Sequence, residues 1–215
     1  TREQHIKREK ATSNICTATA LMATMTGMFA VWHGADGIKE IAMNAYGYAH
    51  AVASKLKEAG YKLAKENFFD TIRIIDVNSS DIRKKALDAG LNFHYPSERC
   101  VQISFDELSS CGEAATIGEI FGCKKGCPAI PEEPSFMKRE NKALTQEIFN
   151  TYHSETEMMR YIKKLERKDI SLTHSMIPLG SCTMKLNAAV EMMPLSWSEF
   201  GNVHPYAPSD QCEGT

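Results

Sequence analysis

The residue types best suited to chemistry gather in one short loop near the end of the 215-residue chain. Gly180 allows a backbone turn, and Ser181, Cys182 and Thr183 follow it as a row of small donors, with Lys185 close behind. A turn of this kind binds an anion or a carboxylate through backbone N–H and hydroxyl groups. The same residues also suit a tight loop that enters a helix, with Thr183 or Asn187 as its cap. Spacing alone favours this plainer interpretation.

A pair of cysteines forms a second candidate site. Cys123 and Cys127 flank two lysines, and neighbouring lysines favour the thiolate form of a cysteine. A metal site would need two more ligands, and the sequence holds no histidine at the spacing typical of zinc sites. The plainer interpretation is an incidental exposed pair, and a thiol redox module is the chemical alternative.

The N-terminal strip, residues 1–14, carries basic side chains that could bind phosphate or nucleic acid. Two glutamates interrupt the strip, and it has no aromatic residue for stacking against bases. A solvated or interfacial surface is the plainer interpretation. The basic residues are Arg2, His5, Lys7, Arg8 and Lys10.

Composition and missing motifs exclude several classes of function. The formal net charge of −2 comes from 25 basic and 27 acidic residues, so no excess charge draws the chain to nucleic acid or to an anionic membrane. The sequence contains no Gly-x-Ser-x-Gly, Walker or dinucleotide-binding fingerprint. Its seven cysteines show no recurring spacing, which favours a reducing compartment over a disulfide framework. A small molecule or another protein is the expected partner.

Two helices are expected in the first part of the chain. Residues 15–32 carry no charge, but threonines and a glycine dilute the segment, and its larger apolar residues recur at steps of three and four. We therefore expect a helix half-buried in a soluble protein, not a membrane span. A second helix is expected from Asp36 to Leu56, after a helix end near Gly34 and before a stop at Gly60. The stripe of the first helix consists of Leu21, Met25, Met28 and Trp32.

The next part of the chain predicts a compact α+β unit. The run at 68–77 alternates as a strand does, and residues 79–89 predict a short helix capped by one of its first three residues. Residues 91–105 predict two strands about a Pro-Ser-Glu-Arg turn, and a last helix is expected at about 113–121. Together with the helix before them, these elements make residues 36–123 an α+β unit.

A change of composition marks a linker after this unit. Three prolines and a glycine within residues 123–136 cannot continue regular structure. Ser154 and Glu157 then stand at capping-box spacing before apolar residues, so a helix is expected over 154–167. The chain from residue 169 onward is expected to be loop-rich.

Three sequence blocks resemble the glycine decarboxylase P-protein family. They occur in the family's order and span the chain from end to end. The resemblance implies an internal fragment of a protein built from two aspartate-aminotransferase-like halves of fold type I, of which the second binds pyridoxal phosphate. The blocks are TREQHIKREKATSNICTATAL, FNTYHSETEMMRYIKKLERKDISL, and HSMIPLGSCTMKLN followed by HPYAP.

The resemblance also implies a division of the chain. Residues 1–35 would be the tail of the first half's large domain with a connecting helix, and residues 36–123 would be its small domain. Residues 124–170 would be a linker with a helix, and residues 171–215 would open the cofactor-binding second half. The expected fold class is α+β, with a mostly helical and loop-rich linker region.

The resemblance implies that the parent enzyme decarboxylates glycine with pyridoxal phosphate and passes the aminomethyl group to the lipoyl arm of the H-protein. The family's Schiff-base lysine lies in a His-Lys-Thr segment, and this chain has no His-Lys dipeptide. We therefore expect the fragment to be inactive by itself and to bind no cofactor. Its expected partners are glycine, lipoylated H-protein and the remaining P-protein domains, in a homo- or hetero-oligomer. Its location would be the cytoplasm of a bacterium, or the mitochondrial matrix of a eukaryote.

Two segments become candidates for lining the glycine or cofactor pocket of the parent, across the interface between the halves. No catalytic residue and no metal ligand is assigned. The alternative function is a non-catalytic scaffold between the two halves, and exposed apolar surface is expected at 15–32 and 192–197 where the large domains are missing. The pocket candidates are Ser181, Cys182 and Thr183 in the first segment, and Arg2, His5 and Asn14 in the second.

Overall fold

The computed structural model describes residues 17–131, 134, 139–168, 174 and 189–213. Contacts between residues divide the chain into two units, Thr1–Met158 and Met159–Thr215. The first unit contains the sheet and the long helix, and the second contains most of the helix Glu155–Glu166 and several short helical turns.

The sheet of the first unit is four-stranded and antiparallel, in the order β1-β2-β4-β3. In β2, Ile72 and Ile74 are buried while Arg73 between them is exposed, which confirms the alternation predicted for this run. The first, two-residue strand was not predicted, because two residues carry no alternation. The strands are β1 (Lys62–Leu63), β2 (Thr71–Ile75), β3 (His94–Ser97) and β4 (Cys100–Ser104).

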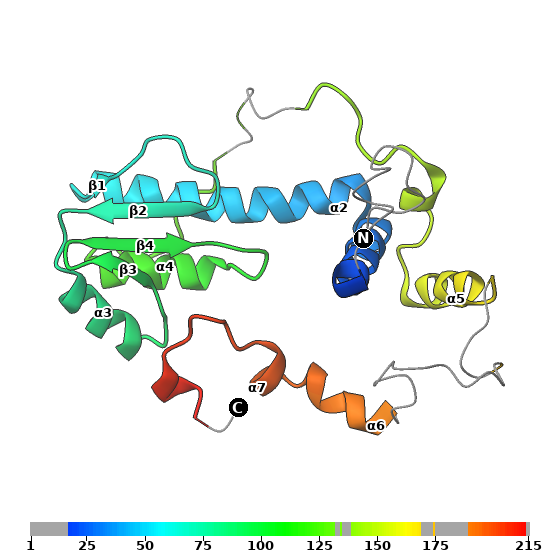
Figure 1. Cartoon of the computed structure of the whole chain (residues 1–215). Helices are drawn as coiled ribbons and strands as arrows, with labels where there is room; N and C mark the ends of the chain where they lie inside the picture. The colour runs from blue at the N-terminus through cyan, green and yellow to red at the C-terminus, as the bar shows by residue number, and fades with distance from the viewer. Residues whose placement is uncertain (1–16, 132–133, 135–138, 169–173, 175–188, 214–215) are drawn as a thin grey trace, which may run out of the picture. The chain divides into compact units, whose positions relative to one another are not determined.

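Three helices bury their apolar faces with the sheet in one core. Figure 1 shows α2 (Thr17–Glu58) running alongside the strands, with α3 (Ser79–Asp88) and α4 (Cys111–Ile120) packed in the same unit. Mixed helices and an antiparallel sheet confirm the α+β class at this level. The largest fully buried side chains are Leu56, Ile72, Ile74, Val52 and Val101.

Side-chain caps fix where the two shorter helices begin. Asn78 caps α3, because its side-chain oxygen accepts from the N–H groups of Ser80 and Asp81. The expectation of a cap within the first three helical residues is therefore wrong by one position. Ser110 and Glu113 form a capping box on α4, so that helix begins two residues earlier than predicted.

The helix α2 is broken at Gly34, where the backbone turns to φ 62° and ψ −170°. This confirms the predicted end of one helix near Gly34 and the start of another after it. Gly60, with φ 88°, follows the end of α2 and confirms the predicted stop. We call residues 17–33 the leading half of α2 and residues 35–58 its trailing half.

The large apolar side chains of the leading half are exposed. Leu21 is 68% exposed and Met25 is 55% exposed, so the prediction of a half-buried helix is wrong for the described chain. Their exposure agrees with the separate expectation of an apolar surface in this stretch. None of the described helices is long and apolar enough to cross a membrane.

Among the described residues after α4, the next helical elements are η2 (Glu147–Asn150) and α5 (Glu155–Glu166). Ser154 Oγ accepts from the N–H of Glu157 at 3.4 Å and donates to its carboxylate at 2.8 Å, as the capping-box spacing predicted. After residue 168 the described residues form only short helical turns, which agrees with the loop-rich prediction for that stretch. They are α6 (Ala189–Met192), η3 (Met193–Ser196), α7 (Ser198–Gly201) and η4 (Ser209–Gln211).

Candidate functional site

All six pocket candidates of the sequence analysis lie outside the described residues. Their arrangement therefore stays a prediction, and the features described below belong to other parts of the chain. These six are Ser181, Cys182, Thr183, Arg2, His5 and Asn14.

The most specific local arrangement in the first unit surrounds the break in α2. Gly34 is buried, and a Cβ at this position would lie 2.8 Å from the carbonyl oxygen of Phe149 and 3.3 Å from Cε1 of His153. The His153 ring reaches past the glycine, and its Nδ1 lies 2.7 Å from the carbonyl oxygen of Trp32. A carbonyl only accepts, so Nδ1 carries the hydrogen in this bond. We call the Phe149 carbonyl and the His153 ring together the clasp.

A groove of about 1170 Å³ lies beside the clasp, between the start of the trailing half of α2 and residues 139–150. Asn150 shapes one wall, since its amide donates to the carbonyl oxygens of Leu144 (3.1 Å) and Gln146 (2.9 Å). Leu144 takes φ 49°, a left-handed conformation that is uncommon for a bulky residue. Its apolar lining is Ala35, Ile38, Ala42, Met43, Phe69, Ala143 and Leu144.

Charged side chains of both signs line the groove: Lys39, Arg139 and Lys142 against Asp36 and Glu147. All five are exposed, so water screens them. The described residues contain no group of three or more His, Cys, Asp or Glu placed to hold a metal ion. The groove can therefore bind a polar or carboxylate group, and it lacks a buried acid or base for proton transfer.

The cysteines are paired differently from the sequence hypothesis. Cys127 is disulfide-bonded to Cys111 at the start of α4, with their Cα atoms 5.3 Å apart, and not to Cys123. Cys123 is a free thiol whose Sγ lies 3.7 Å from the carbonyl oxygen of Lys55. Burial raises the pKa of Cys123, and the charge of Lys55 only partly opposes that rise. The hypothesis of a redox pair between Cys123 and Cys127 is therefore wrong, because Cys127 is bonded to Cys111 instead.

Residues 122–130, which we call the strap, lie against the trailing half of α2. The ammonium of Lys55 donates to the carbonyl oxygen of Gly126 at 2.5 Å. Further along, a Cβ on Gly47 would lie 2.5 Å from Cγ2 of Ile130, so the isoleucine fills the space that a glycine leaves. With the disulfide, these contacts fix the strap at three points.

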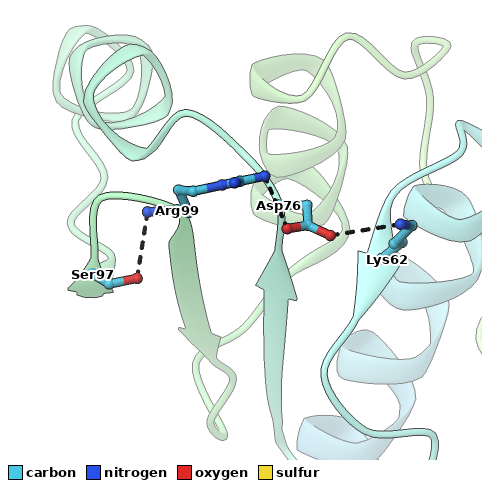
Figure 2. A network of polar contacts seen from close by, with 4 residues as sticks. All are labelled: Lys62, Asp76, Ser97 and Arg99. Carbon is cyan, nitrogen blue, oxygen red and sulfur yellow. Dashed lines mark hydrogen bonds and ion pairs between the residues drawn. The ribbon is translucent and has the colours of Figure 1, made fainter.

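A polar network joins the ends of three strands (Figure 2). Asp76 follows β2 and pairs with Arg99 at 3.1 Å and with Lys62 at 3.6 Å. All three side chains are about half exposed or more, so these ion pairs contribute little to stability. Asp76 takes φ 61°, which an aspartate tolerates better than most residues. We interpret the network as the closure of a strand end, not as a site.

Sequence reasoning missed the clasp and the groove. Trp32 and His153 are 121 residues apart, and neither stands in a pattern that links it to the other. The only available signal was Gly34, because a glycine between two helical patterns marks a backbone turn that other chain segments can approach.

Comparison with known proteins gives one consistent result. A sequence profile described as "Glycine cleavage system P-protein" matches residues 1–121. "Glycine dehydrogenase (decarboxylating)" of Vibrio campbellii is 48% identical over the whole chain, and the proteins of the same name from Aliivibrio fischeri and Nostoc punctiforme are 47% and 46% identical. The chain spans 23% of the length of the first and 24% of the other two.

Proposed function

The chain belongs to the glycine cleavage system P-protein family, and from this premise we propose that it forms part of an enzyme that decarboxylates glycine. The observation that carries the proposal is 48% identity along the entire chain to a glycine dehydrogenase (decarboxylating). Because the chain spans about a quarter of that relative's length, the activity is proposed for a larger protein that contains this chain.

The observed elements support a division of the chain within that protein. We assign residues 36–123 to a small α+β domain, since they hold the sheet, the trailing half of α2, α3 and α4. Residues 1–35 would lead into it from a large domain, residues 124–170 would be the linker, and residues 171–215 would open a second, cofactor-binding half.

Membership in this family implies pyridoxal phosphate, which serves as an electron sink when an amino acid loses its carboxylate. The groove beside the clasp does not fit this cofactor. A lysine that forms a Schiff base is activated by desolvation, whereas Lys39 and Lys142 beside the groove are exposed. We therefore assign the cofactor to another part of the larger protein.

The contribution we assign to this chain is binding and orientation of glycine. Ser181, Cys182 and Thr183 would offer backbone and hydroxyl donors to a carboxylate, and Arg2, His5 and Asn14 would face them from the other half. The aminomethyl group that remains after decarboxylation would pass to the lipoyl arm of the H-protein.

Release of CO2 from glycine by the full-length enzyme tests this proposal. Thr183→Val keeps the size of the side chain and removes its hydroxyl, so kcat/KM should fall about ten-fold, the effect of one lost hydrogen bond. Thr116→Val on α4 is the matched control and should leave kcat/KM unchanged. Unchanged turnover in Thr183→Val would contradict the assignment of this loop to the pocket. A wild type that releases no CO2 would contradict the proposed function.

A scaffold role is the second candidate, and exposed apolar side chains favour it. In the second unit Leu195 is 64% exposed and Trp197 is 50% exposed, and in the first unit the leading half of α2 has an exposed apolar face of its own. Such surfaces suit docking of other domains. Under this alternative, Thr183→Val leaves turnover intact, whereas Trp197→Glu weakens association between separately expressed halves.

A further inference from the structure

The break in α2 leaves a backbone group in need of a partner. In an unbroken helix the carbonyl of Trp32 would accept from the N–H four residues later, across Gly34. The non-helical φ and ψ of Gly34 turn the chain away from that path. A carbonyl next to such a break has to find another donor or water, and it finds His153.

The segment around His153, which donates this bond, is itself ordered by local contacts. Ser154, directly after His153, accepts from the N–H of Met158 at 2.9 Å and starts α5. On the other side, Phe149 belongs to η2, and its carbonyl oxygen approaches Gly34. The clasp therefore joins the break in α2 to a fixed turn of the chain more than a hundred residues later.

Packing holds the leading half of α2 only near the break, where Val31 is 4% exposed. Leu21, Met25 and Phe29 are each about half exposed or more. A Cβ built on Gly27 would meet no atom within 4 Å, so that face is open space. With so little burial to fix its angle, the direction of this half depends on the contacts at Gly34.

We propose that His153 is a positioning residue that sets the direction of the leading half of α2, and that the larger enzyme needs this direction for turnover of glycine. The second step rests on the proposed function. Residues 17–33 form a lever about 25 Å long at 1.5 Å per residue. A tilt of about 10° at Gly34 then moves the far end by about 4 Å, several times the displacement of about 1 Å that costs an enzyme much of its rate.

Three substitutions at His153 separate this role from simple space filling. Asparagine presents an N–H group at the position of Nδ1, glutamine presents one at the position of Nε2, and leucine presents none. His153→Leu and His153→Gln should increase the rate of amide hydrogen exchange in residues 21–33 about ten-fold, as expected for one lost hydrogen bond. His153→Asn should restore the wild-type rate, and the amides of β2 and β4 should stay protected in all three variants. His94→Leu, an exposed histidine on β3, is the matched control.

Turnover by the full-length enzyme tests the link to glycine. His153→Leu should lower kcat/KM for glycine about ten-fold, and His153→Asn should recover it. Equal exchange rates in His153→Leu and the wild type would overturn the clasp as the positioning contact. Faster exchange with unchanged kcat/KM would overturn the link to glycine turnover and leave the proposed function standing. A wild type that releases no CO2 would refute the proposed function while the exchange result still decides on the clasp.

Discussion

The two halves of α2 have similar apolar patterns and opposite surroundings. In the trailing half Leu56 is fully buried, whereas in the leading half Leu21 is 68% exposed. Both residues lie on stripes with helical spacing, so spacing predicts which face of a helix is apolar and not what covers it. The trailing half is covered because the sheet, α4 and the strap all come from the following hundred residues of the same chain.

The largest expected effect tests this difference directly. Leu56→Ala should lower the free energy of unfolding by about 2 to 5 kcal/mol, because it leaves a cavity in the core. Leu21→Ala should change it by no more than about 0.5 kcal/mol, since it removes an exposed side chain. Urea unfolding followed by circular dichroism measures both. Equal losses would show that the leading half is buried in solution.

Reduction of the disulfide tests how much the strap stabilises the fold around the trailing half of α2. Cys111 and Cys127 are exposed and close a loop with a sequence separation of 16, so reduction should cost about 3 kcal/mol of stability. Thermal unfolding with and without dithiothreitol gives the value. A variant with serine at both positions should unfold alike in the two conditions. An unchanged Tm for the wild type would mean that the two thiols are not bonded in solution.

Two glycines of α2, one at the break and one in the leading half, should respond to substitution with opposite signs. Gly34→Ala should destabilise the protein by about 1 to 3 kcal/mol, because its backbone conformation is essentially restricted to glycine and Phe149 occupies the space for a Cβ. Gly27→Ala, in the open leading half, should stabilise it by up to about 1 kcal/mol through helix propensity. The same urea titrations measure both variants. Stabilisation by Gly34→Ala would show that α2 is continuous.

The smallest expected effect concerns the free thiol beneath the strap. Burial raises the pKa of Cys123 above its ordinary value of 9.0, so the folded protein keeps this proton where the unfolded chain loses it. The resulting contribution to stability is present below about pH 9 and is lost as pH rises above it. Iodoacetamide should therefore alkylate Cys123 more slowly than a free cysteine at pH 8. Alkylation faster than that of a free cysteine would support a redox role for Cys123.

Much of the first unit could be predicted because its signals are local. Alternation predicted β2, and the capping-box spacing of Ser154 and Glu157 predicted the start of α5. Gly34 and Gly60 predicted the break and the end of α2. In each case a few neighbouring residues determine the backbone conformation.

The rest depends on contacts between residues that are far apart in the sequence. Cys127 bonds to Cys111 and not to Cys123, which is nearer in sequence, because the start of α4 and the strap meet in space. The groove forms only where residues 139–150 return to α2. The pocket residues proposed from the family resemblance, such as Thr183, lie outside the described residues and stay predictions.

The clasp also has a consequence for the order of folding. The paired strands β2 and β4 are close in sequence, whereas the bond between His153 and Trp32 spans 121 residues. Closing a longer loop costs more entropy, so near contacts form before distant ones. During synthesis the leading half of α2 is made before any of its partners, and the residue that fixes its direction is more than a hundred residues behind. The first helix of the described chain should therefore be the last to reach its final orientation.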